Sequence, residues 1–213
     1  MPRDLIVVHG GGSFGHPVAA AHGISKEHAS RNVHSINAVV DRMTTLHNAV
    51  LGSMTGAGVS AVSFPPRSCV RKSPNGELVG SVETVAAAVE EEFVPVLHGD
   101  IILHEDAGYS VASGDALVVY LAETIGARRI GLCTRVPGVF GPDGEIVDRI
   151  DRFADIEDAL GETEGTDVTG GMAAKITALL EVETAGDIFG VESLPAFFAD
   201  EAPGTTVGWD PAG

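Results

Sequence analysis

The sequence predicts an α/β protein, a three-layer αβα sandwich built on a mostly parallel central sheet. Three observations support this prediction. Short apolar runs of strand length alternate with longer segments in which apolar residues recur at helical spacing. Clusters of Gly, Pro and Asn separate the two kinds of segment. The first apolar run leads through a glycine loop towards a helix. Strands joined through helices pair in parallel, and the helices then cover both faces of the sheet.

Local signals predict the individual elements in chain order. Pro17 suits the first position of the helix that follows the glycine loop, and Gly56 and Gly58 end the long second helix. Residues 73–76 (SPNG) are typical of a hairpin turn, and Ser81 can N-cap the next helix. We expect strands at residues 4–8, 59–64, 94–97, 101–103, 129–133, 188–191 and 205–209, and helices at 32–54, 81–92, 114–126, 156–160, 171–184 and 194–199.

The composition narrows the possible classes of protein. The 213 residues carry a net charge of −17, and Lys26, Lys72 and Lys175 are the only lysines. Such a chain lacks the basic surface that binds nucleic acid. It has neither an apolar run of the ~20 residues that span a bilayer nor the pattern of a signal peptide. We expect a single-domain cytoplasmic protein, with no nucleic-acid or membrane partner and with Cys69 and Cys133 reduced and buried. The acidic surface suggests a halophilic protein, in which salt screens charge repulsion.

Residues 9–17 (HGGGSFGHP) form the first candidate binding site. Glycines permit a sharp turn and a close approach of the backbone to a ligand. Successive N–H groups that lead into a helix make a cradle for an anion. His16 can donate a hydrogen bond to a phosphate oxygen. We interpret the loop as a phosphate site and His9 as a framework residue; the alternative is a purely structural glycine turn.

Residues 167–175 (DVTGGMAAK) form a second candidate anion site. Thr169, Gly170 and Gly171 stand at the expected start of a helix. Lys175 is expected one turn inside it, where its ammonium can reach a phosphate; the alternative is an ordinary surface lysine. The spacing of a P-loop is absent. Two anion cradles, one with a lysine, favour phosphoryl transfer, in which positioning and charge neutralisation do most of the chemistry.

Two further groups of residues carry carboxylates. Asp115, in residues 113–115 (SGD), opens a predicted helix. It either stabilises the helix dipole or holds an ammonium such as that of Lys175. His98, Asp100 and His104 lie around a strand end, where we expect no metal site.

Five stretches occur in the order seen in the amino acid kinase superfamily: residues 9–17, 95–100 (PVLHGD), 113–115, 134–140 (TRVPGVF) and 167–175. Within it the sequence most resembles the archaeal isopentenyl phosphate kinases, and a histidine at the position of His16 is the discriminating feature. The resemblance covers nearly the whole chain. It implies an αβα sandwich with an eight-stranded sheet, usually in a homodimer. It also implies the reaction of ATP with isopentenyl phosphate, with Mg²⁺, to give isopentenyl diphosphate and ADP.

The resemblance further implies roles for individual residues. His16 and the amides of Gly11 and Gly12 would hold the acceptor phosphate, Asp115 would organise catalytic lysines, and Lys175 would contact ATP. The acceptor part, about residues 1–110, would supply Gly11, Gly12, Ser13, Gly15, His16, Gly99 and Asp100, with Ser113 and Gly114 completing its site. The nucleotide part, about residues 111–213, would supply Thr134, Arg135, Gly138, Thr169, Gly170, Gly171 and Lys175. The apolar face of helix 32–54 would line a pocket for the isoprenoid tail.

The sequence departs from the family at two places. The family begins with an earlier strand and a Gly-Gly-Ser loop that bring lysines, whereas Met1 stands just before what resembles the second strand. We expect a start codon assigned too late, the alternatives being a truncation or a degenerate protein, and we expect little activity from residues 1–213 alone. The family usually has aspartates at the positions of Arg135 and Pro137. Arg135 either contacts a phosphate or alters the handling of the nucleotide.

Two other functions stay open at this point. A kinase of another small phosphate or phosphonate, similar to the fosfomycin kinases, would share the histidine loop and differ in the tail pocket. A non-catalytic protein that only binds ligand would keep the fold and lose the reaction. Retention of His16, Asp115 and Lys175 together argues against the second alternative.

Overall fold

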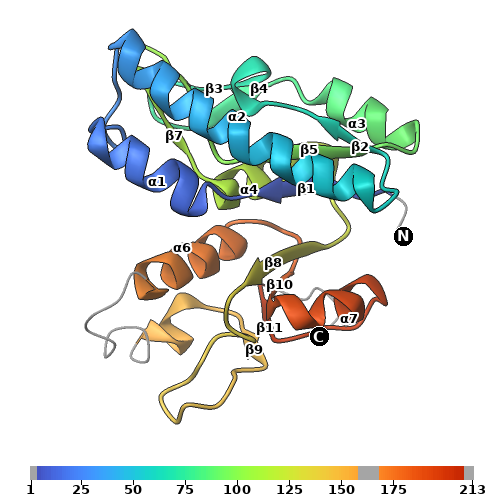
Figure 1. Ribbon diagram of the computed structural model, residues 1–213. Helices are drawn as coiled ribbons and strands as arrows, with labels where there is room; N and C mark the ends of the chain where they lie inside the picture. Colours follow the sequence, from blue (N-terminus) through green and yellow to red (C-terminus); the bar gives the residue numbers. More distant parts are fainter. Residues whose placement is uncertain (1–3, 158–167, 209–213) are drawn as a thin grey trace. The chain divides into compact units, whose positions relative to one another are not determined.

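The computed structural model describes residues 4–157 and 168–208, and its strands and helices confirm the α/β class (Figure 1). The chain divides into two compact units, Pro2–Tyr120 and Leu121–Gly213. In the part of the chain that is described, no helix has the length and apolar character needed to cross a membrane.

A parallel three-stranded sheet lies at the centre of the unit Pro2–Tyr120. Its strands are β1 (Val7–His9), β5 (Val94–His98) and β2 (Ala61–Ser63), in the order β1-β5-β2. β1 and β5 are paired so that His9 lies opposite His98. The carboxyl ends of these two strands therefore meet at one edge of the sheet.

The second sheet of this unit is mixed. It has the order β4-β3-β6-β7, with β4 (Leu78–Gly80), β3 (Val70–Lys72), β6 (Asp100–His104) and β7 (Gly108–Ala112). β3 and β4 form the predicted hairpin. β7, which pairs antiparallel with β6, was not predicted from the sequence. The turn between them places Asp106 at a φ of 64°, a left-handed conformation that Asp adopts more readily than most residues, so no Pro or Asn-Gly signal marked it.

Four helices belong wholly or partly to this unit: α1 (Gly12–Ala21), α2 (Val33–Gly56), α3 (Glu83–Glu90) and α4 (Gly114–Ile125), which runs into the other unit. Asn32 caps α2 by accepting hydrogen bonds from the N–H groups of His34 and Ser35. Two capping predictions were wrong. Pro17 lies inside α1 because the glycine loop already forms its first turn. The N-cap of α3 is Val82, without a side-chain hydrogen bond, and not Ser81.

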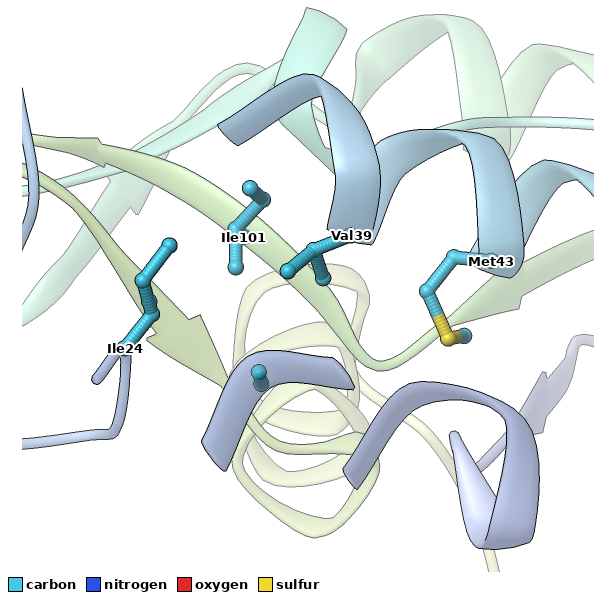
Figure 2. Close-up of a cluster of buried hydrophobic side chains, with 5 residues drawn as sticks. Ile24, Val39, Met43 and Ile101 are labelled. Atoms are coloured by element: carbon cyan, nitrogen blue, oxygen red, sulfur yellow. The ribbon is translucent and has the colours of Figure 1, made fainter. Parts of the chain in front are cut away.

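A hydrophobic cluster joins α1 and α2 to the mixed sheet (Figure 2). Ala19, Ile24, Val39, Met43 and Ile101 form it. Val39 and Met43 are 3% and 2% exposed. These two members of the apolar face of α2 pack in the core, and the expectation that this face lines a tail pocket does not hold for them.

The unit Leu121–Gly213 contains a four-stranded mixed sheet in the order β8-β10-β11-β9. The strands are β8 (Ile130–Thr134), β10 (Gly186–Gly190), β11 (Thr205–Val207) and β9 (Arg149–Ile150). β8 and β10 are parallel, whereas β10 and β11 are antiparallel. The described helices here are α6 (Val168–Leu180) and α7 (Leu194–Phe198), with most of the helical turn predicted at 156–160 outside the described residues. The described strands thus form three sheets and not one continuous ladder.

Both cysteines are free, as predicted, but they are not buried. Cys69 is half-buried and Cys133 is exposed on β8. Cys133 alternates with the buried Ile130 and Leu132 along the strand, so its side chain lies on the outer face.

Candidate functional site

The glycine loop joins β1 to α1 and exposes the first turn of the helix. The N-cap is Gly11, which offers no side-chain cap, and the first turn holds no acidic residue. The N–H groups of Gly12 and Ser13 lie where a helix has no partner of its own for them. Gly12 has a φ of 46°, which favours glycine. This uncompensated N-terminus, at the positive end of the helix dipole, can bind an anion.

Close packing against α2 explains two of the glycines. A Cβ on Gly15 would lie 2.6 Å from Sδ of Met43, and one on Gly11 would lie 3.3 Å from the same sulfur. Gly11 and Gly15 are accordingly buried, whereas Gly10, Gly12 and Ser13 are exposed. Of the predicted loop residues, Gly11 and Gly15 therefore shape the loop by packing, and Gly12 and Ser13 present it to solvent.

His16 lies in the second turn of α1 with an exposed side chain. Its Cδ2 atom is 3.5 Å from the position that a Cβ of Gly11 would take. The imidazole thus stands over the glycine loop. Within the described part of the chain, no hydrogen bond to the His16 ring is found, so both nitrogens can serve a ligand. This position fits the predicted role of His16 at an acceptor phosphate.

The start of α4 packs against the same loop. A Cβ on Gly114 would lie 3.7 Å from the carbonyl oxygen of His9 and 3.8 Å from Cα of Gly10. Gly99 donates its N–H to the same His9 carbonyl at 2.9 Å. Ser113 caps α4, since its Oγ accepts a hydrogen bond from Ala116 N–H at 3.2 Å. The structure therefore brings Gly99, Ser113 and Gly114 to the glycine loop, as expected, and assigns the Ser113 hydroxyl to the helix cap.

Asp100 makes a buried ion pair. Its side chain is fully buried, and its Oδ2 lies 2.8 Å from Nη1 of Arg67, whose side chain is 26% exposed. Its Oδ1 accepts the N–H of Ile101 at 2.9 Å. Burial raises the pKa of Asp100, an effect that Arg67 opposes. Asp100 was predicted to contact the acceptor, but in this structure its oxygens are occupied by Arg67 and the backbone, and Arg67 is the more exposed partner.

Three histidine rings pack together beneath the loop. His9, His47 and His98 come from β1, α2 and β5, with ring centroids 4.7 to 5.4 Å apart. His9 Nε2 lies 3.0 Å from His47 Nδ1, and His47 Nε2 lies 2.8 Å from Oγ of Ser63. Burial, aided by the positive charge of Arg67, lowers the pKa of His47 and of His98 to about 4. Burial also lowers the pKa of His9.

His9 was interpreted from the sequence as a framework residue, whereas His47 had no predicted role. The sequence nevertheless contained a signal that His47 is buried. His47 follows Val39 and Met43 at a spacing of four, which places it on the buried face of the helix, and it is 3% exposed. A polar ring on an apolar helix face requires hydrogen-bond partners. Its partners lie on β1 and β2, at positions that the sequence alone does not bring together.

Lys72 on β3, which had no predicted role, joins the loop at Lys26 to β7. Its Nζ donates to the carbonyls of Lys26 and Val111 at 3.1 and 2.9 Å, and the residue is 8% exposed. Burial lowers its pKa. His104, one of the histidines near the strand end, lies 3.5 Å from Oγ of Ser110 through its Nδ1. Within the described ranges, no group of three or more His, Cys, Asp and Glu side chains is arranged to hold a metal.

The second candidate site belongs to the unit Leu121–Gly213 and includes the loop after β8. Thr134 Oγ1 donates to the carbonyl of Val136 at 2.7 Å and closes a tight turn. Gly138 is buried, and a Cβ there would lie 2.6 Å from Cγ2 of Ile146. Arg135 is exposed in this turn. Thr134 and Gly138 therefore build the loop, while the Arg135 guanidinium is accessible to a ligand.

Helix α6 begins three residues earlier than predicted, at Val168. Thr169, Gly170 and Gly171 therefore form its first turn, and Lys175 lies two turns inside it, not one. Lys175 is half-buried, and side chains on a helix generally lean towards its N-terminus. Asp115 lies in the first turn of α4, in the unit Pro2–Tyr120. Its pairing with Lys175 stays a prediction.

The chain is similar to proteins of one family over almost its whole length. Residues 2–189 match the amino acid kinase family. An isopentenyl phosphate kinase of Haloferax volcanii is 46% identical over 205 residues, which cover 96% of this chain and 83% of the relative. One of Methanothermobacter thermautotrophicus is 33% identical over 192 residues, covering 84% and 72% respectively. An X-ray structure of isopentenyl phosphate kinase aligns with a TM-score of 0.80 at 27% identity, over 97% of this chain and 84% of that one. The chain belongs to the amino acid kinase family.

Proposed function

We propose that this protein is an isopentenyl phosphate kinase that transfers the γ-phosphoryl group of ATP to isopentenyl phosphate, giving isopentenyl diphosphate and ADP. The glycine loop with His16 carries the proposal, because an open helix N-terminus beside an imidazole is suited to binding the phosphate group of an acceptor. The 46% identity to the Haloferax volcanii kinase supports the choice of substrate.

In this proposal the unit Pro2–Tyr120 binds the acceptor. The N–H groups of Gly11, Gly12 and Ser13 and the ring of His16 hold the acceptor phosphate, and Gly15 allows α2 to support the loop. The partly exposed guanidinium of Arg67 lies in this unit, where Asp100 holds it in place. Fixed donors of this kind position the acceptor oxygen for in-line attack on the γ-phosphorus.

The unit Leu121–Gly213 binds ATP in the same proposal. Thr169, Gly170 and Gly171 supply the N–H groups of the first turn of α6, Lys175 neutralises phosphate charge, and Thr134, Arg135 and Gly138 belong to the neighbouring loop. Asp115, which belongs to the unit Pro2–Tyr120, keeps its predicted role of orienting a catalytic ammonium. Mg²⁺ would be held chiefly by the phosphates of ATP, as is usual for this ion, and when bound it supplies charge neutralisation.

The proposal extends to the setting of the enzyme. We infer a homodimer, which light scattering would test by giving twice the mass of one chain, whereas the mass of a single chain would contradict it. We also place the reaction in isoprenoid biosynthesis in the cytoplasm of a halophilic archaeon. The acidic charge of −17 and the two free cysteines fit this setting.

The decisive experiment measures ADP release with isopentenyl phosphate, with isopentenol and with fosfomycin as acceptors. Because little activity is expected from residues 1–213 alone, relative rates decide, and we expect isopentenyl phosphate to be the only one of the three acceptors that raises ADP release above the rate without acceptor. His16→Ala should lower kcat/KM for isopentenyl phosphate by about 10- to 100-fold, the value of a lost hydrogen bond to a charged group. His22→Ala, which removes an exposed ring at the end of α1, is the matched control and should be unaffected. Turnover of fosfomycin instead, or equal activity of His16→Ala, would contradict the proposal.

A further inference from the structure

Two neighbouring strands of the parallel sheet end in the same dipeptide. β1 ends in His9-Gly10 and β5 ends in His98-Gly99, and the two histidines lie opposite each other in the pairing register. Each ring makes the same local contact. His9 Nδ1 lies 3.0 Å from the carbonyl oxygen of Gly10, and His98 Nδ1 lies 3.0 Å from that of Gly99. A carbonyl oxygen can only accept, so each of these Nδ1 atoms carries the hydrogen.

This assignment determines the hydrogen positions of the whole chain of contacts. A neutral His9 with hydrogen on Nδ1 has a lone pair on Nε2, so His47 Nδ1 must donate to it. His47 Nε2 then has the lone pair, and the hydroxyl of Ser63 donates to it. The hydrogen bonds Ser63–His47–His9–Gly10 are therefore all donated in one direction, from the exposed end of β2 through the buried His47 ring to the glycine loop.

The last contact in the chain orients a peptide group of the loop. The Gly10 carbonyl and the Gly11 N–H belong to one peptide, which is trans, so the two groups point in opposite directions. A carbonyl held by His9 directs the Gly11 N–H away from the His9 ring. This N–H is one of the proposed donors to the acceptor phosphate, and a Cβ at Gly10 would meet no atom within 4 Å, so side-chain packing on that side does not fix the peptide.

We propose that His47 is a positioning residue for the phosphate site: by bridging Ser63 and His9 it selects the tautomer of His9 and so fixes the Gly10–Gly11 peptide. This inference rests on the proposed acceptor site. The series of hydrogen bonds requires a neutral His47 ring. The groups that face this ring favour its neutral form, because the rings of His9 and His98 and the guanidinium of Arg67 all oppose a positive charge on it. The carboxylate of Asp100 is occupied by Arg67.

The first test observes the tautomers directly, without any enzymatic reaction. Two-bond ¹H–¹⁵N correlation spectra of the histidine-labelled protein at pH 7 should show three neutral rings with hydrogen on Nδ1, from His9, His47 and His98. Free histidine prefers hydrogen on Nε2, so this pattern reports the contacts. In His47→Leu the His9 signal should move towards the Nε2 form. Hydrogen on Nε2 of His9 in the unmodified protein would overturn the proposal.

The second test measures binding of inorganic phosphate by the chemical shift of the Gly11 amide. We expect His47→Leu to raise the dissociation constant about tenfold, in the range typical of lost supporting contacts, and His47→Asn to restore binding to within about threefold because its amide can donate to His9. His34→Leu, the same change at an exposed position of α2, should match the unmodified protein. Equal binding by folded His47→Leu and the unmodified protein would overturn the proposal.

Kinetics separates this inference from the proposed function. In His47→Leu the KM for isopentenyl phosphate should rise about tenfold while the KM for ATP changes less than twofold, and an equal rise in both would overturn the positioning role. An unmodified protein that shows the Nδ1 tautomers and binds phosphate, yet phosphorylates fosfomycin or isopentenol in preference to isopentenyl phosphate, would overturn the proposed function and support the positioning role.

Discussion

Acid should destabilise the protein through the buried histidines. His47 and His98 have pKa values of about 4 in the folded protein, whereas an unfolded chain binds these protons near pH 6.5. Between these two values the unfolded state binds more protons than the folded state, so the free energy of unfolding decreases as the pH falls from about 6.5 to about 4. Above pH 6.5 both states are neutral and the contribution is complete.

The magnitude follows from the difference between the two pKa values. At about 1.4 kcal/mol per pKa unit, protonating one of these rings in the fold costs about 3 kcal/mol. This is a large share of the 5–15 kcal/mol that stabilises a typical domain. While one ring titrates, the free energy of unfolding should therefore change by up to about 1.4 kcal/mol per pH unit.

The assay is urea unfolding followed by far-ultraviolet circular dichroism at several pH values between 7.5 and 4.5 and at constant ionic strength. His47→Leu should show a shallower dependence of the free energy of unfolding on pH, because one titrating group is lost. His34→Leu, which removes an exposed histidine from the same helix, should keep the slope of the unmodified protein. Carboxylates titrate alike in all three proteins and cancel in the comparison. Identical slopes for His47→Leu and the unmodified protein would refute the reasoning.

Three further predictions concern packing and charge. Gly15→Ala should lower the free energy of urea unfolding by about 1 kcal/mol, because the new Cβ would meet Sδ of Met43 at 2.6 Å and overpacking outweighs the gain in helix propensity. Gly52→Ala, where a Cβ has open space around it, is the control and should be neutral or stabilising. A stabilised Gly15→Ala would contradict the close packing of Gly15 against Met43. Asp100→Asn should lower the free energy of unfolding by about 1–3 kcal/mol, because the Arg67 guanidinium loses the carboxylate with which it is paired. An unchanged free energy of unfolding would show that this ion pair contributes little to stability. With a net charge of −17, the melting temperature should rise between 0.1 and 2 M KCl as repulsion is screened; a fall would argue against adaptation to high salt.

Local sequence signals predicted most elements of the fold. Apolar periodicity and glycine stops located α2, and Asn32 marks its start through a cap that needs only neighbouring residues. The hairpin of β3 and β4 was predicted for the same reason, since its turn chemistry is local. β7 was missed because its turn uses a left-handed Asp106. The division into three sheets was also missed, because strand pairing is a property of distant segments.

The residues of the candidate site divide in the same way, into those that local sequence predicted and those that depend on distant segments. The glycine loop, its position before α1, and His16 beside it could be predicted because they lie within nine consecutive residues. Arg67 could not, because its partner Asp100 is far along the chain and comes near only when η1 (Pro66–Ser68) packs on β6. His47 was hidden for the same reason, although its place on an apolar helix face could have drawn attention to it.

The sequence by itself determined the α/β class and the acidic net charge, and it predicts phosphate binding at residues 9–17, because residue type and short spacing decide each of these. Only the tertiary structure decided what supports the loop. Met43 reaches Gly11 and Gly15 from another helix, and the rings of His9, His47 and His98 meet from two strands and a helix. The physical reason is that close packing and buried hydrogen bonds depend on which distant surfaces come together, and burial then sets the pKa values of the groups enclosed between them.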